Sequence, residues 1–173
     1  MVATRAHRRA APARWRRTVT IGIYAGWIAG AIFALAEMLA MAVLRISPLQ
    51  PWRAFASMVG GRAALETWPM PYAFAVGFVV HAIISAFWGV VYNVLIGARL
   101  GTQSNAQAMA GVIFGLVVWV VDFFLLATLF WPWFLRANLP FQAFVHAAFY
   151  GLPLGLAAAA FWVRAPVRRP RAV

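Results

Sequence analysis

Four long runs of apolar residues alternate with short polar or proline-containing segments along the chain. The runs cover residues 18–44, 71–98, 106–130 and 141–163. Each is longer than the roughly 20 residues that a helix needs to cross the hydrocarbon core of a bilayer. None shows the strict alternation of polar and apolar residues that is typical of membrane strands. The pattern therefore predicts an all-α transmembrane fold, a four-helix bundle.

The connection at 45–70 is the only long one between the predicted spans. Its apolar residues recur at helical spacing and are Trp52, Phe55, Ala56, Val59 and Ala63. Gly60 and Gly61 interrupt this pattern. Two interpretations stay open, a short interfacial helix lying on the outer surface and an ordered loop packed on the bundle.

The basic residues mark an orientation. All 15 are arginines, six of them in the first 17 residues and four in the last ten. If both termini are cytoplasmic, eleven arginines lie on that side and four on the other, as the positive-inside rule expects. The chain thus divides into a cytoplasmic tail at 1–17, a transmembrane domain at 18–163 and a second cytoplasmic tail at 164–173.

Composition and charge indicate the class of protein and the kind of partner it has. Hydrophobic residues make up 65% of the chain and charged residues only 10%, whereas soluble domains carry about 25% charged residues. The net charge of +12 is concentrated in the two tails, where it attracts anionic lipid headgroups. A nucleic-acid reader needs a basic face on a folded domain, so we expect membrane lipid and no nucleic acid as partner.

Several kinds of chemistry have no support in the sequence. The chain has no cysteine, which excludes disulfides, thiolate-bound metal centres and thiol catalysis. It also lacks the Gly-x-Ser-x-Gly, Walker and His-Glu-x-x-His patterns of common hydrolases and nucleotide enzymes. We therefore expect a protein that is not an enzyme.

Two halves of the chain read as copies of one helical hairpin. With an offset of 85 residues, Gly26 and Gly30 align with Gly111 and Gly115, and Glu37 with Asp122. With an offset of 65 residues, His81 in the second span aligns with His146 in the fourth. Because the first and third spans run in the same direction, the pattern predicts a parallel repeat.

Small residues form a stripe on the first span of each predicted copy. The residues of these stripes are Gly22, Gly26, Gly30, Gly111 and Gly115. A stripe with the spacing Gly-x-x-x-Gly is typical of positions where helices approach closely. The neighbour is either another span of the same chain or a partner helix, which would make the protein a homo-oligomer or part of a larger membrane complex.

Four ionisable side chains lie within the apolar spans, apart from tyrosines. They are Glu37, His81, Asp122 and His146. A rise of about 1.5 Å per residue places all four in the outer half of the bilayer at similar depth. Each carboxylate shares a helix face with the glycine stripe of its own span, so both point into the bundle. A charged group in the bilayer is costly and by default indicates function.

Three hypotheses for this polar layer stay open. In the first, each carboxylate pairs with a histidine and holds the helices in register. In the second, the layer binds or passes protons or ions, with Ser85 and Asn93 as candidates for a path further inward. In the third, His81 and His146 are axial ligands of a b-type haem, or they hold a divalent metal together with the two carboxylates.

The amino-acid sequence of the predicted hairpins resembles that of a known group of proteins. The glycine-rich first span, His81 with Ser85 four residues later, Gly111 after an alanine, and His146 are similar to the small four-helix inner-membrane proteins of the YagU type. The resemblance implies four helices in the inner membrane of a bacterium. It also implies a link to acid resistance, without a defined chemistry. No functional residue is carried over from it.

Overall fold

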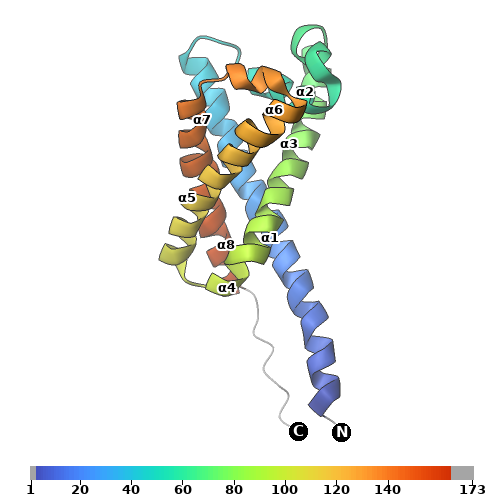
Figure 1. Ribbon diagram of the computed structural model, residues 1–173, viewed down its shortest axis with the longest axis vertical. Helices are drawn as coiled ribbons and strands as arrows, with labels where there is room; N and C mark the ends of the chain where they lie inside the picture. The colour runs from blue at the N-terminus through green and yellow to red at the C-terminus, as the bar shows by residue number, and fades with distance from the viewer. Residues whose placement is uncertain (1–2, 165–173) are drawn as a thin grey trace.

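The computed structural model describes residues 3–164, and this part of the chain contains helices but no strand (Figure 1). Here α denotes α-helices, η1, η2 and η4 are π-helices, and η3 is a 3₁₀-helix. The segments are, in chain order, α1 (Ala3–Val43), α2 (Gln50–Glu66), α3 (Met70–Tyr92), η1 (Asn93–Gly97), α4 (Ala98–Leu100), α5 (Ser104–Val120), η2 (Val121–Leu126), α6 (Ala127–Phe130), η3 (Pro132–Arg136), α7 (Leu139–Val145), η4 (His146–Gly151) and α8 (Leu152–Arg164).

Four continuous helical stretches are long and apolar enough to cross a membrane. They are Arg14–Val43, Met70–Leu100, Ser104–Phe130 and Leu139–Arg164. These stretches confirm the four predicted spans. Helix α1 reaches back to Ala3 without a break, so the predicted N-terminal tail continues this helix rather than forming a separate segment. The predicted C-terminal tail lies outside the described residues except for its first residue.

Local sequence explains where the long helices begin and end. Pro71 and Pro140 lie in the first turns of α3 and α7, where a missing backbone N–H costs nothing. The side chain of Asn138 accepts a hydrogen bond from the backbone N–H of Phe141 at 3.1 Å and so caps α7. Gly101, with a φ of 56°, ends the second long stretch with a turn that favours glycine.

Close backbone contacts join the helices of each predicted hairpin. Helix α1 packs along α3, and α5 packs along η4 and α8. A Cβ atom at Gly26 would overlap the carbonyl oxygen of Ser85, and one at Gly111 would overlap that of Gly151. Gly22, Gly30 and Gly115 likewise lie where another helix of this chain approaches. The small-residue stripes are thus covered by neighbours in the same chain.

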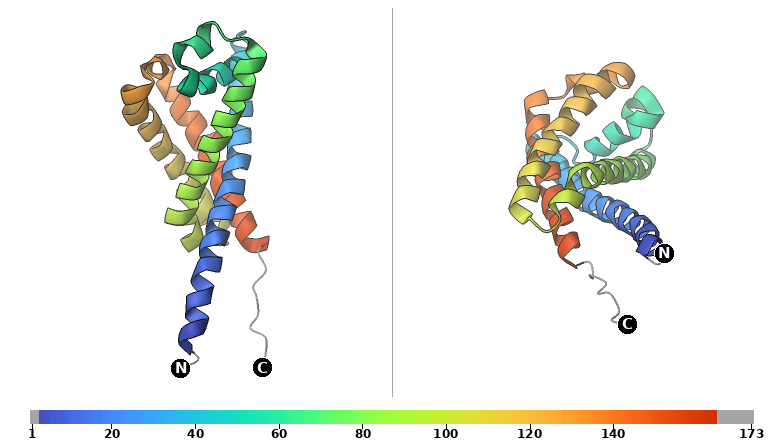
Figure 2. Two further views of the ribbon diagram at one scale, coloured as in Figure 1. Left: turned by 90° about the vertical axis from the view of Figure 1, so that its right-hand side faces the viewer. Right: turned by 60° about the horizontal axis from the view of Figure 1, so that its bottom comes forward.

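Buried hydrogen bonds join the second and third spans at one end. The Tyr92 hydroxyl donates to the side-chain oxygen of Gln107 at 2.6 Å, and the amide of Gln107 donates to the carbonyl oxygens of Gly97 and Gly101, both at 2.9 Å. Tyr92 and Gln107 are fully buried. Towards the other end, α5, η2 and α6 diverge from α3 (Figure 2).

Helix α2 lies over this diverging end, which we call the capped end (Figure 1). It packs along α3, where a Cβ atom at Gly77 would overlap the carbonyl oxygen of Trp52. The indole N–H of Trp131 donates to the carbonyl oxygen of Met58 at 3.0 Å, and that of Trp133 donates to Ser57 Oγ at 2.8 Å. Helix α2 therefore links α3 to the chain that follows α6.

The long connection is thus helical, but its buried face differs from the predicted one. Val59, expected on the apolar face, is 67% exposed, whereas Ser57 is fully buried. Ser57 is buried because its hydroxyl has two partners, the carbonyl oxygen of Ala54 and the indole of Trp133. Gly61, with a φ of 60° and a ψ of −154°, kinks the helix at the glycine pair that interrupts its apolar pattern.

The glycine contacts generate a prediction for stability. Replacing Gly26 by leucine places a side chain against the backbone of α3, and overpacking of this kind costs about 1–3 kcal/mol. We expect Gly26→Leu to lower the midpoint of thermal unfolding in detergent. The matched control is Ala31→Leu, because Ala31 is exposed on the same helix. Equal midpoints for both variants would contradict the packing role of Gly26.

Candidate functional site

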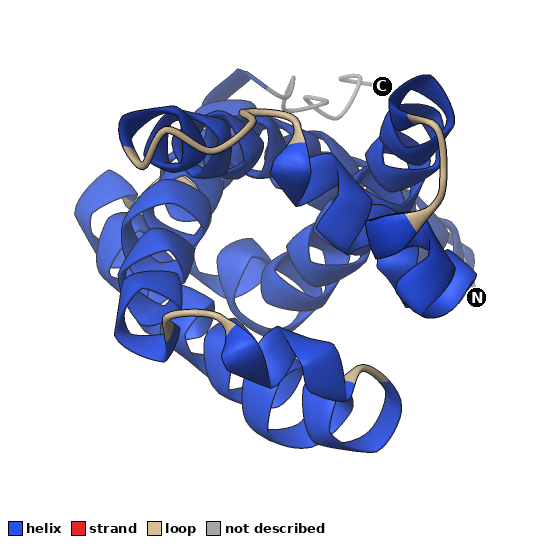
Figure 3. Ribbon diagram, turned by 90° about the horizontal axis from the view of Figure 1, so that it is seen from above, coloured by secondary structure: helices blue, strands red, loops and turns tan. Residues whose placement is uncertain are grey.

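A cavity of about 240 Å³ lies beneath the capped end. Side chains from all four long helices and from α2 line it. The four ionisable residues predicted from the sequence, Glu37, His81, Asp122 and His146, are all among them. Figure 3 looks down on the ring of helices that surrounds this region. The structure therefore brings the predicted polar residues together around one space.

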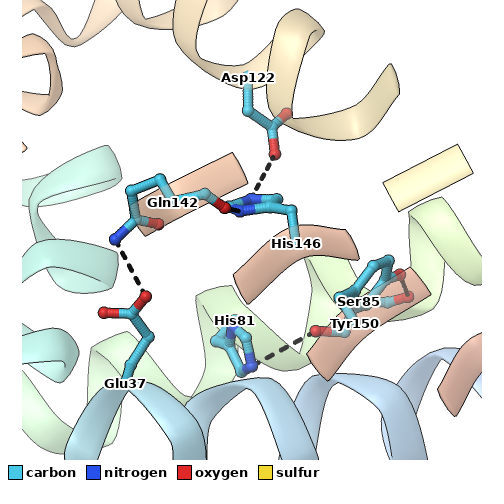
Figure 4. A network of polar contacts seen from close by, with 7 residues as sticks. All are labelled: Glu37, His81, Ser85, Asp122, Gln142, His146 and Tyr150. Atoms are coloured by element: carbon cyan, nitrogen blue, oxygen red, sulfur yellow. Dashed lines mark hydrogen bonds and ion pairs between the residues drawn. The ribbon is translucent and has the colours of Figure 1, made fainter. Parts of the chain in front are cut away.

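A chain of polar contacts crosses the cavity from α1 to η2 (Figure 4). The amide nitrogen of Gln142 donates to Glu37 Oε1 at 3.0 Å. One helical turn further, Nδ1 of His146 donates to the backbone oxygen of Gln142 at 2.7 Å. The other ring nitrogen of His146, Nε2, lies 4.0 Å from Asp122 Oδ2. Glu37 and His146 are only 6% and 7% exposed.

His81 belongs to a second, separate set of contacts. Its Nε2 lies 2.9 Å from the carbonyl oxygen of Gly30 and 3.5 Å from Ser85 Oγ. The hydroxyl of Tyr150 donates to the backbone oxygen of the same serine at 2.9 Å. These contacts link α1, α3 and η4. Of the two carboxylate–histidine pairs expected, only Asp122 with His146 is found, because Glu37 accepts from an amide and His81 bonds to backbone.

Aromatic side chains form much of the cavity wall. The ring of Phe55, from α2, stacks on His81 with a centroid distance of 4.2 Å. The ring of Phe33 packs against both histidines, with centroid distances of 6.0 Å to His81 and 4.8 Å to His146. Phe123 meets His146 edge-on at 5.8 Å. The histidines are thus packed among rings on one side and hydrogen-bonded on the other.

Two π-helical segments present the Asp122–His146 pair. Asp122 is the second residue of η2, and His146 is the first residue of η4. A π-helical turn widens the helix locally and changes the direction of its side chains, and such turns are frequent at functional sites. Both segments contribute side chains to the same cavity. The backbone irregularities of the third and fourth spans therefore coincide with their ionisable residues.

Gln142 is the residue of this site that the sequence analysis missed. It connects Glu37 to His146 through its side chain and its backbone. A signal was present, because Gln142, His146 and Tyr150 follow one another at intervals of four residues in an otherwise apolar span. Residues four apart share a helix face. This spacing therefore predicts a polar stripe on the fourth span that contains Gln142 as well as His146.

The described geometry shows how each of the two histidines is held. The Phe33 ring packs against both imidazoles. Nε2 of His81 and Nδ1 of His146 are directed at carbonyl oxygens, which places hydrogens on those nitrogens and leaves a lone pair on the opposite nitrogen of each neutral ring. Among the described residues, no three side chains of histidine, aspartate or glutamate come together as a metal site. The haem and divalent-metal hypotheses for these residues stay predictions.

In comparisons with known proteins, no protein family, curated protein or solved structure matches the chain.

The hydrogen bonds predict opposite tautomers for the two buried histidines. A carbonyl oxygen only accepts, so neutral His81 carries its hydrogen on Nε2 and neutral His146 carries it on Nδ1. Nitrogen NMR of histidine-labelled protein distinguishes the two forms. Spectra of His81→Ala and His146→Ala assign the signals. Finding the same neutral tautomer at both positions would contradict the described geometry.

Proposed function

We propose that the protein is a non-enzymatic accessory protein of the bacterial inner membrane that takes up and releases a proton within its buried polar network. The observation that carries the proposal is the approach of His146 Nε2 to Asp122 Oδ2 at 4.0 Å. The proton held by this pair links protonation to the packing of the third span against the fourth. Such a protein responds to protons rather than transforming a substrate.

The hydrogen-bonding pattern gives the pair its dependence on a proton. Because Nδ1 of His146 donates to Gln142, Nε2 of the neutral ring carries a lone pair. A lone pair facing an ionised carboxylate is a contact between two acceptors, which is repulsive. One added proton makes the interaction attractive, and an approach of the two groups from their separation of 4.0 Å then forms a charge-assisted or neutral hydrogen bond. Protonation therefore changes the sign of an interaction between η2 and η4.

Contacts at the far end favour a proton-binding role over a proton channel. Asn93, a candidate for a path further inward, is fully buried. Its amide donates to the carbonyl oxygen of Thr18 at 2.6 Å, and its oxygen accepts from the indole of Trp162 at 3.1 Å. These partners give Asn93 a packing role between α1, η1 and α8. The cavity is the observation that supports the alternative function, a proton-coupled transporter.

We also propose a membrane topology for the chain and an origin of its fold by duplication of a helical hairpin. The arginine distribution supports cytoplasmic termini, and the many exposed large apolar side chains on the four long helices suit contact with lipid. A four-helix bundle derived from a duplicated hairpin is supported by matching contacts. A Cβ atom at Gly30 would crowd His81, and one at Gly115 would overlap the backbone of His146. The capped end then faces away from the cytoplasm, with α2 at that surface.

Infrared difference spectroscopy of the protein in lipid vesicles tests the proton role. In the difference spectrum between acidic and neutral pH, we expect a band from a protonated carboxyl group. It lies on the high-frequency side of the C=O stretching range of carboxylic acids, where carboxyl groups shielded from water absorb. Asp122→Asn removes this component, and His146→Phe shifts or removes it. Glu66→Gln is the matched control, because Glu66 is an exposed acid paired with Arg62. Identical difference spectra for the wild type and Asp122→Asn would contradict the proposal.

A further inference from the structure

We propose that the cavity beneath the capped end binds a small organic cation with an aromatic or otherwise apolar body. This inference goes beyond proton exchange, because it rests on the shape, walls and charge of the cavity. A concave, mostly apolar space with a few convergent polar groups is the usual form of a small-molecule site. The chemistry of those walls and polar groups indicates which class of molecule fits.

The size of the cavity suits a small ligand. Its volume of about 240 Å³ equals that of roughly eight water molecules at their volume in the liquid. Pockets for drug-sized ligands measure roughly 300–1,000 Å³. A single substituted ring or a short branched chain therefore matches the space. Met41 and Met58 also line it, and methionine side chains adapt readily to differently shaped ligands.

The charges around the cavity favour a cation. The whole chain has three acidic residues, and two of them, Glu37 and Asp122, line this space. No arginine is among its lining residues in the described part of the chain. The two carboxylates carry two negative charges when ionised and one when the Asp122–His146 pair holds a proton. In both states a monocation is attracted and an anion is repelled.

The carboxylate of Glu37 has acceptor capacity that no described residue uses. The amide of Gln142 and one nitrogen of each histidine already donate to protein oxygens. Glu37 is 94% buried, and its second carboxylate oxygen accepts no hydrogen bond from the described residues. A carboxylate oxygen beside a mostly apolar cavity is stabilised by a donor or a positive charge. An ammonium group provides one or both.

The aromatic walls add a second attraction for the same class of ligand. Phe33, Phe55, Trp88, Phe123 and Tyr150 line the cavity together with the carboxylates. The faces of aromatic rings carry negative charge density and attract organic cations, and rings also pack well against an apolar body. The combination of several rings with two acids is the usual recognition chemistry for substituted ammonium groups.

Calorimetry of the full-length protein in detergent tests the proposal with two ligands of the same shape. Phenyltrimethylammonium is the cation, and tert-butylbenzene is its uncharged counterpart. We expect saturable binding of the cation, at least tenfold tighter than that of the neutral compound. Benzenesulfonate, an aromatic anion, gives no binding. Because the cation has no transferable proton and pH is constant, this result is independent of the infrared test of proton uptake.

Variants locate the binding within the cavity. Glu37→Gln weakens binding of the cation at least tenfold, whereas Glu66→Gln, at an exposed acid, leaves it unchanged. Thermal unfolding of each variant verifies that it is folded. The comparison of ligands on the wild-type protein stands even where a variant fails to fold. Equal affinity for the cation and its uncharged counterpart, or no saturable binding of the cation, would overturn the proposal.

Discussion

The hydrogen bond from the Gln142 amide to Glu37 is the contact on which the polar interior depends. A carboxylate inside an apolar helical assembly is costly unless a partner compensates its lost hydration. Gln142 provides that partner with its side chain and holds His146 with its backbone oxygen. One residue of α7 thereby joins an acid of the first span to the carboxylate–histidine pair of the third and fourth spans.

The cavity follows from an asymmetry between the two halves of the chain. Helix α1 packs along both α3 and α8, whereas α3 and α5 make few close backbone contacts and are joined by hydrogen bonds at Tyr92 and Gln107. The space that opens between them is closed by α2, which lies in the connection that makes the first half longer. Trp131 and Trp133 hold α2 in place. An extra helix in one half thus encloses the polar residues of both.

Sequence reasoning identified the four spans and the ionisable residues because both depend on local properties. Long apolar runs are typical of spans whatever their packing, and a residue such as Glu37 or Asp122 is conspicuous within them. Which partner each one meets depends on the rotation of helices about their axes. The π-helical turns of η2 and η4 alter that rotation, and a regular 3.6-residue pattern does not predict them. The role of Gln142 depends on the same geometry.

The burial of Ser57 could not be predicted from the sequence for a related reason. Its side chain is buried against the indole of Trp133, 76 residues away in the sequence. Contacts between segments so far apart are not encoded in local periodicity. The packing role of the glycines could be predicted from the sequence, because a close approach of two helices needs a small residue whichever helix is the partner. Gly26 and Gly111 show this on different spans.

Cross-linking in the membrane tests most directly whether the two halves meet through this network. The chain has no cysteine, so an introduced pair reacts without competition. With a short thiol-specific linker, the account predicts efficient bridging within one chain between Glu37→Cys and Gln142→Cys. It predicts none between Glu37→Cys and Gln103→Cys, since Gln103 is exposed near the opposite end. Absence of bridging in the first pair, or equal bridging in both, would contradict the account.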